Sequence, residues 1–305
     1  MDLARLAVLR ELAERGSVSA VAAATHRSPS AVSQQLKALQ RSAGVVLVER
    51  VGRGVRLTDA GRALAASAAR VATAVAEAEA TWDAYRDGTS GTVRVSLFTS
   101  AAELLVPGLL HRMAAHPHVS LEVEDHDVAQ DDFAAHTREA DVVVAHRSDD
   151  VVPAERADLR VVPLLREPLD VAVPLDHALA GRDRVPARDL AGERWVGVPP
   201  DYPLDRALVA LAASIGEPAA VALRFPHLPL IENLVAAGHG IALVPRYASG
   251  GRAPGRFHLV EVGDVRAGRH IEALVRPDRA ARLTVRTVLE ELREQARRVA
   301  RPGPH

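Results

Sequence analysis

Between Asp59 and Tyr85 the chain runs for 27 residues without a proline, and Gly61, in the first turn, is its only glycine there. Leu64, Val71, Ala78 and Tyr85 recur every seven residues, with Ala68, Val75 and Trp82 beside them. This spacing predicts a helix about 40 Å long with one narrow apolar stripe. Such a stripe favours a partner helix, although packing against the chain's own body is the alternative. The rod separates two parts of the chain that differ in pattern.

The part before the rod predicts three short helices and a two-stranded wing. The first helix is expected from Leu3 to Arg15-Gly16, and the second over 20–24 with Ser17 or Ser19 as its cap. Ser28 followed by Pro29 is a cap followed by proline at the first helical position, which opens a third helix. The wing strands are expected at 45–48 and 55–57, with Thr58 capping the rod.

The third helix has the residue types that DNA recognition requires. Ala31, Val32, Leu36 and Leu39 form its apolar face. The opposite face carries hydrogen-bonding groups suited to base edges and a cation suited to a phosphate: Ser28, Ser30, Ser33, Gln34 and Lys37. A capped, solvated helix face is the simpler alternative for this pattern taken alone.

The charge distribution supports a polyanion partner for this part of the chain. Residues 1–62 contain ten Arg and Lys against five Asp and Glu, a net of +5, whereas the whole chain has a net charge of −1. The remainder is therefore about −6. A basic head on an acidic body is typical of a protein with one nucleic-acid-binding domain.

After a linker at 87–91, strands alternate with helices to the end of the chain, which favours an α/β fold with mainly parallel sheets covered by helices. Two separate extended runs are expected at 159–165 and 169–174. One continuous last helix is expected over 280–298.

Composition removes several function classes. The absence of cysteine excludes disulfides, thiolate metal sites and cysteine nucleophiles. No nucleophile elbow, phosphate loop or zinc-peptidase motif occurs, so we expect no catalytic residues, no cofactor, no metal and no enzyme activity. Four neighbouring histidines lack a ligand spacing and are expected to be solvated: His111, His116, His118 and His126. The sequence also lacks a long apolar run and a secretory pattern at its first residues, which predicts a cytoplasmic protein without a membrane partner.

Three segments before residue 62 resemble those of a known family. Residues 19–24 and 28–39 (SAVAAA and SPSAVSQQLKAL), followed by 44–61 with its Glu49-Arg50, Gly52-Arg53-Gly54 and Leu57-Thr58, resemble the N-terminal domain of LysR-type bacterial transcriptional regulators. Residues 141–144, 172–180 and 236–245 are similar to landmarks of that family's effector-binding half. Pro29, Gln40 and Val48 depart from residues that are common in the family.

The resemblance implies a multidomain fold. An all-α winged helix-turn-helix domain would occupy 1–58, with the helix-turn-helix at about 18–40, and a linker and dimerisation helix would occupy 59–87. An α/β effector domain similar to type 2 periplasmic binding proteins would occupy 88–305. Its lobe I would be about 92–162 with 269–298, and its lobe II about 163–268.

The resemblance also implies site residues and partners. The wing Arg53 would lie along the DNA backbone or in the minor groove, and Arg50 near a phosphate. The stripe would pair two chains, so that two recognition helices face two half-sites of a palindrome-like double-stranded operator. The expected DNA-binding residues are Ser28, Pro29, Ser30, Ser33, Gln34, Lys37, Arg50 and Arg53; the expected dimerisation residues are Leu64, Val71, Val75, Ala78, Trp82 and Tyr85.

Ligands of open α/β sheets lie outside the C-terminal ends of parallel strands. A small-molecule effector is therefore expected where strands end, near Thr99, Ser100, His146, Asp201, Tyr202 and His227. The expected assembly is a homodimer or a homotetramer, with RNA polymerase as a further partner. The alternative is a small-molecule binding protein or enzyme whose N-terminal domain serves only for assembly. That alternative does not explain why residues 1–62 carry a net charge of +5.

Overall fold

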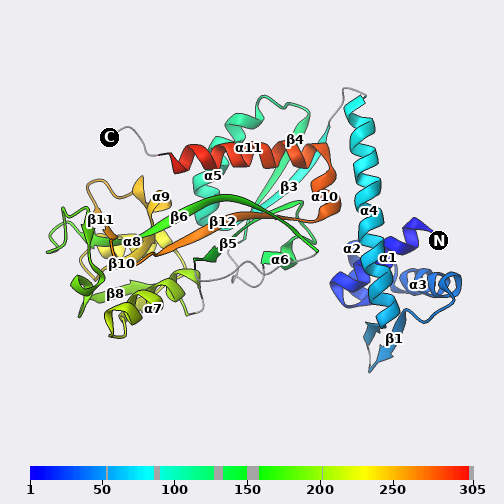
Figure 1. The fold of residues 1–305 in the computed structure, drawn as a ribbon, viewed down its shortest axis with the longest axis horizontal. Coiled ribbons are helices and arrows are strands. Elements are labelled where there is room, and N and C mark those ends of the chain that lie inside the picture. Colours follow the sequence, from blue (N-terminus) through cyan, green and yellow to red (C-terminus); the bar gives the residue numbers. More distant parts are fainter. Residues whose placement is uncertain (53, 86–89, 127–132, 150–157, 201, 302–305) are drawn as a thin grey trace. The chain divides into compact units, whose positions relative to one another are not determined.

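The computed structural model describes residues 1–301 except 53, 86–89, 127–132, 150–157 and 201 (Figure 1). The chain divides into two compact units. Unit 1 is Met1–Thr89 with Arg276–Leu283, and unit 2 is Ser90–Val275 with Thr284–His305. No helix among the described residues combines the length and the apolar character needed to cross a membrane.

Unit 1 begins with the three predicted helices and the wing. Their bounds are α1 (Leu3–Arg15), α2 (Val18–Ala24), α3 (Pro29–Ala43), β1 (Val48–Val51) and β2 (Gly54–Leu57). Ser17 and Ser28 each accept a hydrogen bond from a backbone N–H three residues later, which confirms them as caps. Helices α1 and α3 end at Gly16 and Gly44, both in the left-handed conformation that glycine adopts without strain.

The first wing strand begins at Val48, three residues later than expected. Strand β1 pairs with β2 from Val48↔Leu57 to Val51↔Gly54, so residues 45–47 have no partner strand. The side-chain oxygen of Gln40 accepts hydrogen bonds from the N–H groups of Leu47 and Val48, both at 2.9 Å. Gln40 therefore fixes the point at which the chain leaves α3 and enters the wing.

Helix α4 (Asp59–Tyr85) confirms the predicted rod. It packs against α1 and α10 (Pro277–Ala281) through small residues on one side, which allow close approach: Gly61, Ala65, Ala68, Ala76 and Ala80. At Gly61 a Cβ would lie 2.1 Å from the Leu47 carbonyl oxygen, so glycine is required there. The core of the unit contains Leu9, Val32 and Leu39, which have no exposure.

The expectation of one continuous last helix is wrong. Arg282 is extended (φ −64°, ψ 135°) and separates α10 from α11 (Leu283–Ala300). The break separates buried residues that belong to different units. Ala280 and Ala281 are buried in unit 1, whereas Val288 and Leu292 are buried in unit 2. Ala280 and Ala281 favour a helix, whereas four β-branched residues follow the break and have lower helix propensity: Thr284, Val285, Thr287 and Val288.

Unit 2 is α/β. Besides α11 its helices are α5 (Thr99–Met113), α6 (Phe133–His136), α7 (Pro203–Ile215), α8 (Leu228–Ala236) and α9 (Arg246–Gly250), with a 3-10 turn at Ala187–Leu190. Its strands are β3 (Gly91–Leu97), β4 (Val119–Asp125), β5 (Val142–Ser148), β6 (Arg160–Pro174), β7 (Arg184–Val185), β8 (Arg194–Gly197), β9 (Ala220–Arg224), β10 (Ala242–Pro245), β11 (Phe257–Val262) and β12 (Gly268–Val275).

The large sheet is mixed, which corrects the expectation of mainly parallel sheets. Its strand order is β4-β3-β5-β12-β6-β11-β7, and β10 also pairs with β6. Strand β3 pairs in parallel with β4 and β5, but every pairing made by β6 and β12 is antiparallel. The long strands β6 and β12 run side by side through the unit (Figure 1).

The two extended runs expected at 159–165 and 169–174 form one strand, β6. Its pairing with β12 shifts at Ile271/Glu272, where Leu165 and Pro163 are the consecutive partners. The register therefore bypasses Leu164, a bulge that accommodates a proline without a ladder N–H. The first half of β6 pairs with β12 and the second half with β10 and β11, so the strand passes from lobe I (β3, β4, β5) into lobe II (β7 to β11).

Candidate nucleic-acid interface and interlobe cavity

The polar face of α3 is open to solvent. Ser28, Pro29, Ser30, Gln34 and Lys37 are exposed and Ser33 is half-buried, while Val32, Leu36 and Leu39 are buried on the other side. The residues of α3 that were predicted to bind DNA therefore lie at the surface, with Ser33 half-buried.

The hydroxyl groups on this face are partly used within the helix. Ser28 Oγ accepts from the Ala31 N–H and lies 2.9 Å from Ser30 Oγ, and Ser33 Oγ donates to the Pro29 carbonyl. Ser33 therefore retains only acceptor capacity for an outside partner, whereas the Gln34 amide offers both donors and an acceptor.

The basic residues of unit 1 fall into two sets. Arg10 and Arg15 form ion pairs with acids of α1 or α10, Arg56 pairs with Glu49 across the wing, and Arg62 pairs with Asp59. Within the described chain, no acidic side chain lies at ion-pair distance from four exposed cations on or beside α3 and the wing, Arg27, Lys37, Arg41 and Arg50, nor from Arg70 on α4, which contacts the Ser67 hydroxyl. Arg53 lies outside the described residues.

Arg27 and Arg41 were not predicted from the sequence. Arg41 follows Lys37 by one helical turn, so helical spacing alone contains the signal for it. Arg27 precedes the cap Ser28 and carries no comparable signal.

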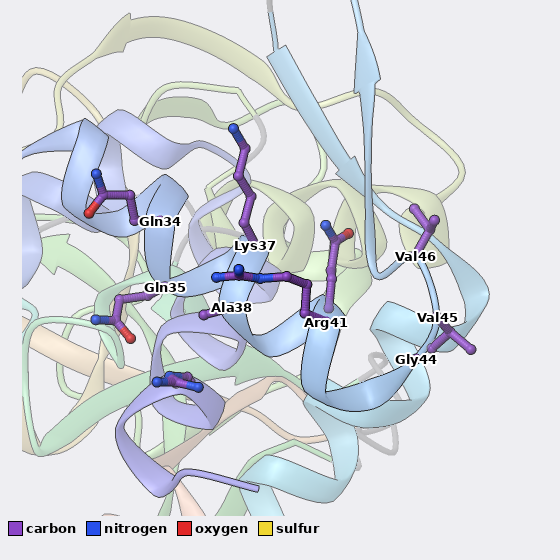
Figure 2. A pocket seen from close by; sticks show the side chains of 10 residues that line it. Gln34, Gln35, Lys37, Ala38, Arg41, Gly44, Val45 and Val46 are labelled. Atoms are coloured by element: carbon purple, nitrogen blue, oxygen red, sulfur yellow. The ribbon is translucent and has the colours of Figure 1, made fainter.

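A wide groove of about 900 Å³ runs beside this cationic face. Figure 2 shows Gln34, Lys37 and Arg41 following one another along α3, with Val45 and Val46 in the segment after Gly44. Arg5 of α1 completes the lining. The groove thus combines three cations with three side-chain amides, those of Gln34, Gln35 and Gln40, and two exposed apolar side chains.

Most of the predicted stripe on α4 lies apart from the buried alanines, although Ala68 belongs to both sets. Leu64 is half-buried against the core of unit 1, and Ala78 is exposed. The larger stripe residues are exposed, namely Val71 (37%), Val75 (39%), Trp82 (63%) and Tyr85 (85%). The alternative in which the stripe packs against the body accounts for Leu64 and for Ala68, which is buried in the core of unit 1.

Unit 2 encloses a cavity of about 70 Å³ between its two lobes, called here the interlobe cavity. Five of the six predicted effector residues line it: Thr99, Ser100, His146, Tyr202 and His227. Asp201 lies outside the described residues. Residues distant in sequence meet here because strands β3 and β5 end on the lobe I side, and the segments before α7 and α8 face them from lobe II.

A buried ion pair forms part of the cavity wall. Arg269 donates from Nε and Nη2 to Glu167 Oε2, at 2.9 and 2.7 Å, and from Nη2 to Ser100 Oγ at 2.9 Å. Glu167 is fully buried, and its other oxygen accepts from the N–H groups of Tyr247 and Ala248. The sequence shows no motif for this pair, because β6 and β12 bring it together only in the register Arg269↔Glu167.

His146 is 6% exposed and contacts the rings of Phe98 and Phe133, at centroid distances of 4.3 and 5.3 Å. Its Nδ1 atom is buried and has no hydrogen-bond partner in the described structure. Burial, and then the charge of Arg269, hold the pKa of His146 well below 6.5. The imidazole is therefore neutral at pH 7.

The remaining histidines form no metal centre among the described residues. His116 Nε2 lies 3.1 Å from Glu291 of α11, and His126 stacks near His136 at 5.0 Å between ring centroids.

Comparisons with known proteins cover both units. The model of the bacterial regulatory helix-turn-helix proteins of the lysR family matches residues 3–62, and the LysR substrate binding domain matches residues 86–297. The transcriptional dual regulator GltC of Bacillus subtilis (strain 168) is 29% identical over 246 residues, which covers 80% of this chain and 81% of that protein.

Solved structures share the fold along most of the chain. Full-length OxyR from Pseudomonas aeruginosa, in a variant with one cysteine replaced by aspartate, has a TM-score of 0.66 at 20% identity and covers 96% of this chain and 98% of its own. CbnR in complex with its target DNA has a TM-score of 0.54 at 21% identity and covers 97% of this chain and 100% of its own.

Proposed function

The chain belongs to the LysR family of transcriptional regulators, and we propose that it binds a palindrome-like operator as a homodimer whose DNA affinity responds to a small molecule in the interlobe cavity. DNA binding and transcription regulation are the activity of this family. The operator, the assembly and the effector site are the proposed parts.

The unpaired cations carry the proposal for the DNA interface. Arg27, Lys37, Arg41 and Arg50 are exposed, lie on or beside α3 and the wing, and lack acidic partners in the described chain. Arg10, Arg15 and Arg62 of unit 1 are neutralised by Asp or Glu, whereas Arg70 of α4 contacts only the Ser67 hydroxyl. Cations left free on one face attract the phosphate backbone, while Gln34 and the serines of α3 supply contacts to base edges.

The dimer rests on the exposed stripe of α4. A narrow row of Val71, Val75, Ala78, Trp82 and Tyr85 on a long helix is suited to a second copy of the same helix. Two copies would present two α3 helices to two half-sites. A homotetramer would consist of two such dimers. RNA polymerase is a further proposed partner of the DNA-bound protein.

The effector proposal rests on the five predicted residues that meet at the interlobe cavity. The chain has no cysteine, so an oxidised thiol is excluded as the signal. This separates it from the OxyR relative whose structure carries a substituted cysteine.

The test begins by selecting a duplex from a random-sequence DNA library with the full chain. Gel-shift titrations from 50 to 200 mM salt then compare Lys37→Ala and Arg41→Ala with the parent. Each should weaken binding to all duplexes and reduce the slope of log affinity against log salt by about one. Ser33→Ala combined with Gln34→Ala should weaken binding to the selected duplex more than to unrelated DNA.

Arg184→Ala is the matched control, because Arg184 in lobe II pairs with Glu261 and lies outside unit 1. It should leave the salt slope unchanged. A DNA affinity that does not fall with salt in the parent protein would contradict the proposed function and favour a small-molecule binding protein with an assembly domain.

A further inference from the structure

Of the 38 Lys and Arg residues in the chain, Lys37 is the only lysine. A guanidinium keeps its proton throughout the physiological pH range, whereas a lysine ammonium can release its proton and then attack an acyl carbon. Acylation of side-chain amines is therefore confined to one position of the sequence. A chain that begins at Met1 has one other primary amine, its α-amino group.

That position lies on the face of α3 that we propose for DNA binding. Lys37 is exposed, and within the described chain no acidic side chain lies at ion-pair distance from it. Figure 2 shows its side chain extending away from α3, with the amine clear of the other labelled side chains. An acyl group on Nζ replaces the positive charge with an uncharged amide. One acylation would thus remove one phosphate contact from each α3 helix.

The groove beside Lys37 contains cations suited to a phosphoryl group. Its lining includes Arg5 and Arg41, and none of its described lining residues is Asp or Glu. Arg5 lies 3.6 Å from Asp2, measured from Nε to Oδ2, so part of its charge is offset. Arg41 is exposed and has no acidic partner in the described chain. Arg41 is therefore the cation of the groove that is most available to an anion.

Side-chain amides add hydrogen-bond donors to the same groove. Gln34, Gln35 and Gln40 all line it. The Gln40 oxygen accepts from the N–H groups of Leu47 and Val48, which leaves its NH₂ group free to donate. Cations together with neutral donors are the groups that bind phosphate oxygens.

Arg41 follows Lys37 by one helical turn, which separates their Cβ atoms by about 5–6 Å. A phosphoryl group bound by Arg41 therefore brings an attached acyl carbon within reach of the Lys37 amine. The groove has a volume of about 900 Å³, so a small acyl phosphate enters it without displacing protein atoms.

We infer that Lys37 is an acylation site whose donor is a small acyl phosphate, held by its phosphoryl group against Arg41, and that this modification weakens DNA binding. Nζ attacks the carbonyl carbon, a C–N bond forms, and the C–O bond to phosphate breaks with its electron pair leaving on the phosphate. The Lys37 ammonium loses two protons; the departing phosphate takes up one and water the other. The inference rests on the proposed function, since it names a regulation of the same surface.

The groups that hold the donor are those proposed to hold a DNA phosphate. The two ligands therefore compete, so free protein should be acylated and DNA-bound protein should be protected. An acylated chain would stay off DNA until the amide is removed, because the positive charge of Lys37 is lost.

The first test treats the full chain with acetyl phosphate and locates acetyl groups by peptide mass spectrometry. Acetylation of Lys37 should be several-fold slower in Arg41→Gln than in the parent, and inorganic phosphate or the selected duplex should slow it in the parent. Arg62→Gln is the matched control, because Arg62 pairs with Asp59 and does not line the groove, so it should be acetylated at the parental rate.

A second reagent separates binding of the donor from reactivity of the amine. The N-hydroxysuccinimide ester of acetic acid transfers the same acyl group without a phosphoryl group. It should acetylate Lys37 equally fast in the parent and in Arg41→Gln, and inorganic phosphate should not slow it.

Gel shifts then compare treated and untreated protein on the selected duplex. Treatment should weaken binding by the parent roughly tenfold or more at 0.1 M salt and reduce its salt slope to that of untreated Lys37→Gln, which also lacks the charge. Lys37→Arg has no side-chain amine, so treatment should leave its affinity at its own starting value. This comparison excludes the α-amino group as the cause.

Four results would each overturn the inference: Lys37 unmodified by acetyl phosphate, equal acetylation rates by acetyl phosphate in the parent and Arg41→Gln, undiminished affinity of the acetylated parent, or an equal loss of affinity in treated Lys37→Arg. By contrast, an untreated parent whose DNA affinity does not fall with salt would contradict the proposed function. Acetylation of Lys37 is measured without DNA, so the two failures are distinguishable.

Discussion

Glu167 and Arg269 show how a buried charge is tolerated in this protein. Every acceptor direction used by the Glu167 carboxylate faces an N–H donor, two from Arg269 and two from the backbone of α9. The Arg269 guanidinium also stacks over Phe98, 5.0 Å from the ring centroid. The pair itself comes from β6 and β12, and α5 and α9 contribute the hydrogen-bonding groups around it. The pair therefore links both lobes at the point where the two long strands pass from one lobe to the other.

His146 makes the stability of unit 2 depend on pH. Its pKa in the folded protein lies well below 6.5, held there first by burial and then by Arg269, whereas in the unfolded chain it lies near 6.5. Below pH 6.5 the unfolded chain therefore binds a proton that the folded protein does not. Stability should fall as the pH is lowered from about 7 to 5, with a slope approaching about 1.4 kcal/mol per pH unit.

Urea unfolding followed through Trp195 fluorescence, in the Trp82→Phe background, measures this slope. His146→Gln should remove most of it, and the remainder belongs partly to His270, whose pKa is also lowered by burial. The exposed His258, changed to Gln, is the control and should leave the slope as it is. A parent protein that is equally stable at pH 5 and pH 7 would contradict the burial of a neutral imidazole.

Sequence patterns located one wall of the interlobe cavity and missed another. Thr99, Ser100, Tyr202 and His227 follow a strand or lie at the start of a helix, and His146 lies near the C-terminal end of β5, which is where ligands of open sheets bind. Arg269 and Glu167 lie inside strands, 102 residues apart, and only the register of β12 on β6 makes them neighbours. Local signals do not encode such a register.

At the scale of helices and strands, the start of α4 depends on one close approach. Gly61→Ala would gain about 1 kcal/mol from helix propensity, but its methyl group would lie 2.1 Å from the Leu47 carbonyl oxygen. Overpacking against backbone costs about 1–3 kcal/mol or more, so the clash outweighs the propensity. We expect Gly61→Ala to lower the unfolding temperature of unit 1 by several degrees and to weaken operator binding.

Gly54→Ala is the matched control, since its methyl group would lie 3.7 Å from the Val51 carbonyl oxygen, an ordinary contact. Circular dichroism melts of both variants, with gel shifts on the selected duplex, check the prediction. If Gly61→Ala unfolds at the same temperature as the parent, α4 and the Leu47 segment can move apart without a measurable loss of stability, which would contradict the prediction.

Elements were predictable where their signals are local. Ser17, Ser28, Gly16 and Gly44 mark helix ends through their own hydrogen bonds or backbone angles, and all lie at the expected positions. The break at Arg282 has no cap residue or glycine to mark it. The β-branched Thr284 and Val285 lower the helix propensity after it, and the packing of α10 in unit 1 accompanies the break. Likewise, β6 is one strand because two partners in succession cover it.

At the scale of the whole molecule, α4 has one buried side and one exposed apolar side. Its alanines are buried within unit 1, whereas Val75 and Trp82 are exposed. Glu77 lies off the stripe and is exposed, so charge is already tolerated elsewhere on the helix. If the stripe pairs two chains, a charge placed on it should cost far more than a charge placed on the opposite side.

The variant Val75→Glu with Trp82→Glu should therefore sediment as a monomer at concentrations where the parent is a dimer. Its operator affinity should fall at least tenfold, because one α3 helix then binds without the second, while its circular dichroism stays unchanged since both side chains are exposed. Ala84→Glu, on an exposed position about 200° around the helix from Trp82, is the control and should remain dimeric. A stripe variant that stays dimeric and binds the selected duplex with parental affinity would place the dimer contact elsewhere on the chain.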